Sequence, residues 1–523
     1  MAVFELVLAL LLAGAVLSAW ARRLKTPYPA LLALAGAGLA LLPNTPRVAL
    51  DPQLALALFV APVLLDSAFD SSPRDLKQNW RPLVSLALVA VALTVAAVAL
   101  VARWVVPDLP WASAIALGAI VAPPDAAAAS AVLKQLRPPH RLLVIIEGES
   151  LFNDASALLI YRLAVGAAVT GGFSVATAVP MLGLVSVGSL VLGAVLSRVM
   201  LAFTQRVEDV PTAVILQFVG TFSVWMLAER LHLSGIITMV VFAILVARTA
   251  PMRTPARLRI PSYAVWEVTV FVLNVLAFIL VGLQLKPILE HLGSAQRVTY
   301  LIASAAVCAA VILVRVAWVM SYATVGQVIR GRFGARRPGP PTHQSLGSAA
   351  VVAWCGMRGI VTLAAALALP ADFAHRDLLV LASFSVVLVT LVLQGLTLNP
   401  LMRLLSLAGD DTVAREIRLA RVEVARAALA ALGDGPPDGE RGLLRRKLES
   451  HLQRVERAAA DPGGPDISAA DTESLRRAHQ AERRTLFDLR ARGVIGDDAF
   501  HRVEEELDWG ELNAEGMARG SDL

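Results

Sequence analysis

The sequence predicts an all-α polytopic membrane protein with about 13 transmembrane helices and a helical cytoplasmic tail. Three observations lead to this fold class. The 523 residues are 57% hydrophobic and 17% charged, with a mean hydropathy of +0.66, whereas soluble domains carry about 25% charged residues. Long apolar segments recur up to residue 405, and charged residues at helical spacing follow. Cys308 and Cys355 lie inside apolar segments, which excludes a disulfide framework and a structural zinc site.

The transmembrane helices are assigned from segments of roughly 17–25 mostly apolar residues, which suffice to cross a hydrocarbon core of about 30 Å. The first such segment lacks the basic start of a signal peptide and runs directly into Arg22 and Arg23, so we interpret it as a span. Spans are predicted near residues 3–20, 28–43, 53–69, 83–102, 111–133, 142–168, 176–203, 211–228, 233–249, 262–285, 298–321, 347–369 and 378–404. They define a transmembrane domain, residues 1–405.

The charges of the loops predict the orientation, because Lys and Arg gather in cytoplasmic loops. Nineteen of these residues lie in the loops after odd-numbered spans, and six lie in the other loops. This bias predicts an outside N-terminus and a cytoplasmic C-terminus. We expect the protein to lie in the plasma membrane. The net charge is +12 for residues 1–405 and −6 for the remainder. The positive excess therefore belongs to membrane loops and does not indicate a nucleic-acid partner.

Residues 406–523 form the predicted cytoplasmic tail. Helical patterning of Arg, Glu and apolar residues covers 415–431 and 443–459, and a linker rich in Pro and Gly follows at 461–465. The tail contains no recognisable catalytic or phosphate-binding motif. We expect a solvated helical region without a ligand.

Ionisable residues inside the spans are few, and each is a functional hypothesis because a charge near the bilayer centre is costly. Asp154 lies thirteen residues beyond Arg141, about 20 Å along a helix, which places it near the midplane. Ser150 and Glu147 share its helical face, and Asn153 is adjacent. Such oxygen ligands suit an alkali cation or a proton rather than a transition metal. The other candidates are Asp66, Asp125, Glu149, Glu267, Arg315 and Arg358.

Two spans contain signals that interrupt a helix. Pro123 and Pro124 remove two backbone donors from the fifth span, and Asp125 suits the start of the next half-helix. Carbonyls freed by such a break become cation ligands, although a plain proline kink capped by Asp125 is an alternative. In the twelfth span Gly356 and Gly359 flank Arg358. One broken helix early and one late indicate a transporter with inverted repeats and a site between the breaks.

Glu149 requires a buried partner, and Arg315 and Arg358 are the candidates. We expect Arg315 to form a structural ion pair with Glu149 and Arg358 to be a fixed positive charge near the crossing of the broken helices. Arg162, late in the sixth span, is expected to extend to the outer interface.

The segment 147–155, Glu-Gly-Glu-Ser-Leu-Phe-Asn-Asp-Ala, resembles the signature of the sodium/proton antiporters of the monovalent cation/proton antiporter-1 family. This family includes bacterial NhaP-type exchangers and animal sodium/proton exchangers. The resemblance extends over about residues 1–405. Further matches follow in order along the chain at Pro123-Pro124-Asp125-Ala126, Leu233-Ser234-Gly235-Ile236, Trp266-Glu267, Gly356-Met357-Arg358-Gly359 and 390–395.

The resemblance implies a thirteen-helix homodimer with a dimerisation domain and a mobile ion-binding core. Asp154 would be the site that alternates between cation and proton, with Asn153 and Ser150 beside it and Asp125 at the neighbouring break. Asp66 would be a further ligand where the family usually has glutamate, so that Asp154, Asp66 and Ser150 would hold Na⁺. The carbonyl of Pro124 would stand where the family often has threonine. The Glu149–Arg315 pair resembles the family's structural salt bridge.

These residues predict a secondary antiporter that exchanges a monovalent cation, first of all Na⁺, for H⁺ by alternating access, with roles in pH and sodium homeostasis. Competition for one buried carboxylate couples the two fluxes, and a single carboxylate beside Asn153 favours electroneutral exchange. The sequence offers no nucleophile with a base and no nucleotide motif, so we expect neither an enzyme nor a cofactor. The alternatives are K⁺/H⁺ exchange on the same scaffold, a cation channel, and a membrane sensor with a signalling tail.

Overall fold

The computed structural model of the protein describes residues 2–24, 26–42, 51–136, 138–170, 175–291, 296–333, 345–405, 407, 409–432, 440–460, 469–492, 494, 499–500, 503–504 and 506–509. These residues form helices joined by turns, and no strand occurs among them. The chain divides into two compact units, Met1–Gly409 and Asp410–Leu523.

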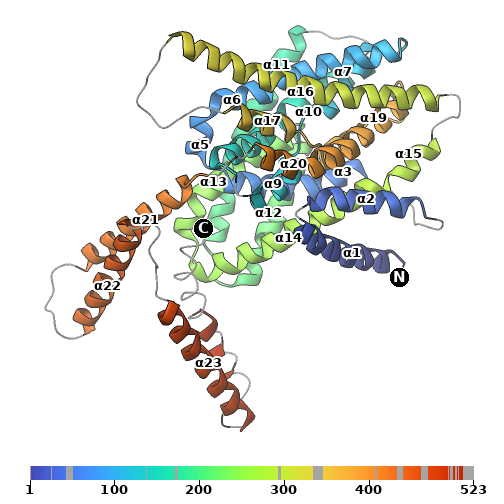
Figure 1. Cartoon of the computed structure of the whole chain (residues 1–523). Coiled ribbons are helices and arrows are strands. Elements are labelled where there is room, and N and C mark those ends of the chain that lie inside the picture. The colour runs from blue at the N-terminus through green and yellow to red at the C-terminus, as the bar shows by residue number, and fades with distance from the viewer. Residues whose placement is uncertain are drawn as a thin grey trace. The chain divides into compact units, whose positions relative to one another are not determined.

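The first unit consists of apolar helices (Figure 1) and of three π-helical segments, which are named η1, η2 and η3. In chain order the elements are α1 (Ala2–Leu24), α2 (Tyr28–Ala40), α3 (Pro52–Ala55), η1 (Leu56–Val60), α4 (Ala61–Asp70), α5 (Pro73–Gln78), α6 (Trp80–Val84), η2 (Ser85–Ala90), α7 (Val91–Val105), α8 (Trp111–Val121), α9 (Ala126–Leu136), α10 (His140–Thr170), α11 (Val175–Thr204), α12 (Val210–Arg230), α13 (Gly235–Arg253), α14 (Ala256–Leu283), α15 (Leu285–His291), α16 (Arg297–Phe333), α17 (Leu346–Trp354), α18 (Ile360–Leu367), α19 (Arg376–Val389), η3 (Thr390–Gln394) and α20 (Gly395–Leu404).

Each predicted span coincides with a helix or with consecutive helices. Among the described residues, eight helical stretches are long and apolar enough to cross a membrane by length and composition, and Val7–Ala21, Tyr28–Ala40 and Gly235–Ala250 are shorter apolar helices. The remaining predicted spans are α10, which carries several charged residues, and the α17/α18 pair, which is split into two short halves. The all-helical membrane fold is confirmed, while the number thirteen stays a prediction.

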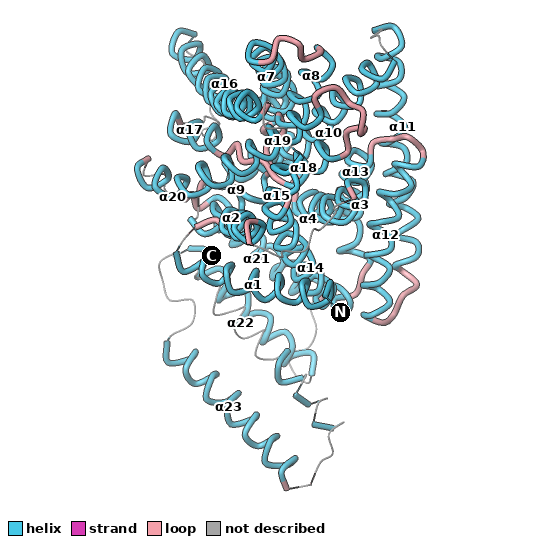
Figure 2. The backbone as a smooth tube through the Cα atoms, turned by 90° about the vertical axis from the view of Figure 1, so that its right-hand side faces the viewer, coloured by secondary structure: helices cyan, strands magenta, loops and turns pink. Residues whose placement is uncertain are grey.

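The helices of the first unit pack in two groups. In one group α14 packs against α1, α2 and α12, and α13 packs against α4, α11 and α12. In the other, α16 packs against α7, α17 and α19, and α8 packs against α7, α10 and α19. Figure 2 shows α7 and α16 together at one end of the unit and α1, α2 and α14 toward the other. Because α9, α10 and α18 contact helices of both groups, the interrupted helices lie between the groups.

Small residues allow the close packing of α2 against α14. A Cβ atom at Gly36 would collide with the backbone of Ile279, and one at Gly282 would collide with the backbone of Ala33. Between helices in a membrane, van der Waals contact of closely approaching backbones replaces the hydrophobic driving force that acts in water. These two glycines therefore set the distance between the two helices.

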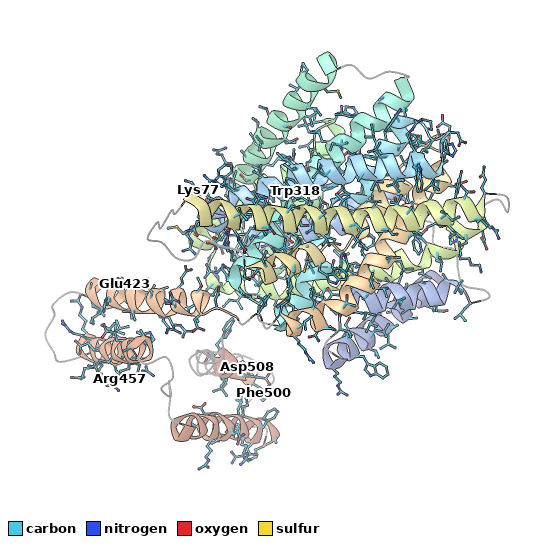
Figure 3. The ribbon with its side chains drawn as sticks, turned by 45° about the horizontal axis from the view of Figure 1, so that its top comes forward. Lys77, Trp318, Glu423, Arg457, Phe500 and Asp508 are labelled. Carbon is cyan, nitrogen blue, oxygen red and sulfur yellow. The ribbon has the colours of Figure 1, made fainter. Side chains whose placement is uncertain are left out.

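The second unit contains α21 (Thr412–Ala431), α22 (Glu440–Ala460) and α23 (Ala469–Ala491). Its first two helices coincide with the predicted helical segments 415–431 and 443–459, whereas the predicted linker 461–465 lies outside the described residues. Arg426 on α21 pairs with Glu456 on α22 at 2.8 Å. Figure 3 shows Glu423 and Arg457 on these two neighbouring helices. The fold of this unit is thus a helical hairpin followed by a third helix.

Candidate cation and proton site

The two predicted breaks are real and lie against each other. The first separates α8 from α9 at residues 122–125, where two prolines remove backbone donors, and the second separates α17 from α18 at residues 355–359. The backbone N–H of Asp125 donates to the carbonyl of Met357 at 2.7 Å, which joins the two breaks. The N–H of Arg358 donates to Oγ1 of Thr390 at 3.0 Å. Four half-helices therefore point their ends at one small region.

Arg358 donates hydrogen bonds to carbonyls at the C-terminal ends of α8 and α17. Its Nε donates to the carbonyl of Val121 at 2.9 Å, Nη2 donates to that of Ala122 at 3.2 Å, and Nη1 donates to that of Gly356. The last carbonyls of a helix lack intrahelical partners and carry a partial negative charge. Arg358 is only 1% exposed, and within the described chain its guanidinium bonds to backbone carbonyls and to no carboxylate. Its position suits a fixed positive charge beside the two breaks, as expected from the sequence.

The Asp125 carboxylate lies at the N-terminal ends of α9 and α18. Its Oδ1 accepts from the backbone N–H of Ala127 at 2.8 Å, at the start of α9, and its Oδ2 lies directly against Gly359, at the start of α18. A carboxylate at the positive end of a helix is stabilised by the unsatisfied N–H groups there. Asp125 and Arg358 thus neutralise the N-terminal and C-terminal ends of the interrupted helices, respectively.

Asp154 on α10 faces this crossing. It is buried, 5% exposed, and lines a cavity of ≈ 40 Å³ together with Asp125, Ser150, Pro124 and Thr362. A volume of about 10–15 Å³ of this kind holds one water molecule, so the cavity has room for a small hydrated or bare ion. Among the described residues, no hydrogen-bond donor reaches the Asp154 carboxylate. Its charge is therefore available to a proton or a cation.

The neighbours of Asp154 connect α10 to the first break. The side-chain N–H of Asn153 donates to the carbonyl of Pro124 at 3.4 Å, and Oγ of Ser150 accepts from the N–H of Ala126 at 3.3 Å. Asn153 is fully buried, and its Oδ1 has no hydrogen-bond partner in the described part of the chain. This amide oxygen, together with the carboxylate and the hydroxyl, provides oxygen ligands of the kind that suits a monovalent cation.

The structure places Asp66 apart from these residues. It lines a larger cavity of ≈ 540 Å³, which also contains Asp70, Glu267 and Arg259. Asn274 lines both this cavity and the small cavity at Asp154, so the two are adjacent. Asp66 thus lies on the cavity next to the one that contains Asp154. Within the described ranges, no group of three or more His, Cys, Asp or Glu side chains could hold a metal ion.

Glu149 pairs with Arg315, the partner expected from the sequence. Nη1 of Arg315 donates to Oε1 at 2.5 Å and Nη2 donates to Oε2 at 2.8 Å, and both side chains are at most 3% exposed. Nε and Nη2 of Arg315 also donate to the carbonyls of Ala353 and Val352 at 3.2 Å and 3.0 Å. The pair joins α10, α16 and α17 beside the second break.

Two residues at the site were not identified from the sequence as site residues. Thr390, in the π-helical segment η3, accepts a hydrogen bond from the N–H of Arg358, and Asn274 lines both cavities. Thr390 was visible only as part of a matching segment, and an isolated Asn in an apolar helix is more often a packing residue. The feature of the sequence that could have identified Thr390 and Asn274 is that each is a polar residue within an apolar segment.

Comparisons with known proteins identify the family to which the chain is similar. Residues 7–404 match the family described as "Sodium/hydrogen exchanger, transmembrane". The Na⁺/H⁺ antiporter ApNhaP of Aphanothece halophytica is 30% identical over 504 residues, which cover 92% of this chain and 91% of that protein. The low-affinity Na⁺/H⁺ antiporter NhaS1 of Synechocystis is 31% identical over 417 residues, with 76% and 75% covered.

The fold is also that of a solved antiporter. The sodium proton antiporter MjNhaP1 from Methanocaldococcus jannaschii superposes with a TM-score of 0.61 at 18% identity, covering 78% of this chain and 99% of that chain. Exchangers of this kind are secondary transporters and not enzymes. Because the family match extends over residues 7–404, this chain belongs to the sodium/hydrogen exchanger family.

Proposed function

We propose that this protein exchanges Na⁺ for H⁺ across the plasma membrane, with Asp154 as the residue that binds either ion. The observation that carries the proposal is the position of Asp154, buried in a small cavity against two interrupted helices. Relatives that are named as Na⁺/H⁺ antiporters support the choice of ions. A role in pH and sodium homeostasis follows, and the ions are substrates, with no resident cofactor.

Coupling follows from the cost of an empty buried charge. A carboxylate in a low-dielectric site without hydrogen bonds is strongly destabilised. Either a proton or a cation neutralises the Asp154 carboxylate, and once one is bound the carboxylate no longer attracts the other. Asp125 already accepts a backbone hydrogen bond at the start of α9, so Asp154 is left as the exchanging group. One exchanging carboxylate supports one proton per cation and electroneutral transport.

We propose that Asp154, Ser150 and the free Oδ1 of Asn153 hold Na⁺ in the small cavity. Asp66 lies on the larger cavity and would contribute as the ion arrives from that side. The Pro124 carbonyl accepts the Asn153 amide and remains a further oxygen at the break. Glu149 and Arg315 would keep α10 aligned with α16 and α17.

The proposed orientation has the N-terminus outside and residues 406–523 as a cytoplasmic tail beyond the exchanger domain of residues 1–405. The ends of α4, α11 and α13 and the start of α14 then face the cytoplasm, and all four contribute to the larger cavity. The cavity would therefore open inward. We propose that α7–α10 and α16–α19 move as the ion-binding core against α1, α2, α4 and α11–α14, which would form the dimer scaffold.

The experiment uses everted membrane vesicles, a pH-sensitive dye and separate additions of Na⁺, Li⁺ and K⁺. We expect Na⁺ to collapse the proton gradient in vesicles with the wild-type protein and not with Asp154→Asn at equal membrane content. Asp70→Asn, an acid on the larger cavity, is the matched control and should retain exchange. Normal exchange by Asp154→Asn would remove the proposed site, and a response to K⁺ alone would favour the alternative K⁺/H⁺ exchange.

A further inference from the structure

An ion pair fastens α10 to the turn between α12 and α13. Nη2 of Arg162 donates to Oε1 and Oε2 of Glu229 at 2.8 Å and 3.0 Å, and Nη1 donates to the carbonyl of Leu233 at 3.2 Å. Both oxygens of one carboxylate and a carbonyl of the same turn thus accept from one guanidinium. Such a planar multidentate contact fixes position as well as charge.

The α12–α13 turn is held rigidly on its own side. Oε1 of Glu229 also accepts the N–H of Gly235 at 3.4 Å, and Oγ of Ser234 accepts the N–H of Ile237 at 3.3 Å as the N-cap of α13. The N–H of Ser234 donates to Oγ of Ser189 on α11 at 2.9 Å. The acceptors of Arg162 therefore belong to the helix group that contains α11, α12 and α13.

The pair lies at the end of the unit opposite the larger cavity. Gln217 and Thr221 of α12 line that cavity, and Glu229 is eight residues beyond Thr221, about 12 Å of helix. On α10, Arg162 is eight residues beyond Asp154, about 12 Å. The order along the proposed path is therefore the larger cavity, Asp154, and then the Arg162–Glu229 pair.

We infer that the Arg162–Glu229 pair is a gate that closes the outer end of the exchanger while Asp154 is open to the larger cavity. The inference rests on the proposed function. Arg162 moves with Asp154 on the core, and its acceptors belong to the proposed scaffold, so the pair breaks when the site opens outward. The two side chains are 42% and 43% exposed. An ion pair of that exposure shifts an equilibrium by at most about fivefold, which lets it favour one state and still break in each cycle.

The test joins the two positions with a reversible link. Arg162→Cys/Glu229→Cys is made in a background without the two buried cysteines and treated in vesicles with a short bis-methanethiosulfonate reagent. We expect cross-linking to stop Na⁺/H⁺ exchange and reductant to restore it. Ser189→Cys/Ser234→Cys, whose positions both lie within the scaffold group, is the matched control and should keep its activity when cross-linked. If the cross-linked Arg162→Cys/Glu229→Cys variant exchanges ions as fast as it does after treatment with reductant, the pair is not a gate.

A second test reverses the charge of Arg162 and then swaps the charges of Arg162 and Glu229. Arg162→Glu places a second carboxylate next to that of Glu229, and the two repel each other. The state that is open to the larger cavity then becomes less populated, so the half-maximal Na⁺ concentration on the cavity side should rise at least twofold. Arg162→Glu/Glu229→Arg should return that concentration to the wild-type value. Unchanged half-maximal concentrations in both variants would contradict the gate. Absence of exchange by the unmodified protein would instead contradict the proposed function.

Discussion

The Asp125 carboxylate lies directly against Gly359, in the space that a Cβ atom at position 359 would fill. The contact exists because the start of α18 approaches the first break so closely that the backbone of residue 357 accepts the Asp125 N–H at 2.7 Å. Gly359 is thus required by the break at residues 122–125, which contains Asp125, as well as by the break at residues 355–359 to which it belongs.

Gly359→Ala should therefore abolish exchange. The added methyl group forces Asp125 away from the ends of α9 and α18, and overpacking of this kind costs about 1–3 kcal/mol. Thermal unfolding in detergent and dye-detected exchange measure the two effects. Gly38→Ala is the control, because a Cβ atom there meets no other atom within 4 Å. Wild-type exchange by Gly359→Ala would show that the Asp125 contact has no role in transport.

Arg358→Lys should lower the exchange rate at least tenfold although it preserves the positive charge. A lysine ammonium cannot direct hydrogen bonds to the carbonyls of Val121, Ala122 and Gly356 together. Each buried carbonyl left without a donor costs about 1–3 kcal/mol. Initial rates at saturating Na⁺ test this, with Arg403→Lys at the end of α20 as the control. Equal rates for Arg358→Lys and wild type would mean that charge alone suffices.

The sequence predicted the parts of the site that depend on local chemistry. Consecutive prolines remove backbone donors that a helix needs, the glycines beside Arg358 favour a second break, and acids in apolar spans are few enough to identify. The sequence favoured Arg315 over Arg358 as the partner of Glu149, but the contact itself depends on the packing of α16 against α17. The position of Asp66 on the larger cavity, away from Asp154, depends on the rotation of α4 and was not predicted. Such contacts join residues far apart in the chain.

The buried Glu149–Arg315 pair should be far more sensitive to loss of one partner than the exposed Arg162–Glu229 pair. Glu149→Gln leaves a buried guanidinium without its counter-charge, which costs about 3–5 kcal/mol, whereas Glu229→Gln should cost at most about 1 kcal/mol. Chemical or thermal unfolding of the two single variants gives the comparison. Replacing both members, as Glu149→Leu/Arg315→Met, should recover part of the lost stability. Equal destabilisation by Glu149→Gln and Glu229→Gln would contradict this difference.

Exchange should be insensitive to membrane potential. Asp154 is the acid of the small cavity without a hydrogen bond among the described residues, so one proton and one Na⁺ compete and no net charge moves. Proteoliposomes with fixed Na⁺ and pH gradients and a potential set by K⁺ and valinomycin provide the measurement. A protonophore control reports the potential itself. A rate that follows the imposed potential would refute electroneutral exchange.

Asp75, in α5 between the apolar helices that end at residue 70 and begin at residue 80, should make stability depend on acid pH. Burial acts to raise the pKa of its carboxyl, but hydrogen bonds from Ser72, Arg74 and His140 outweigh burial and hold the pKa below the ordinary 3.8. A carboxyl whose pKa is lowered by folding stabilises the fold above the unfolded value, and this contribution disappears as the pH falls through the folded value. Asp75→Asn should therefore lower the melting temperature at pH 7, and its difference from wild type should shrink as the pH falls below 3.8. Glu208→Gln, in the exposed loop before α12, is the control and should match wild type at every pH. A difference between Asp75→Asn and wild type that stays constant over the whole pH range would show that the charge of the Asp75 carboxylate does not stabilise the fold.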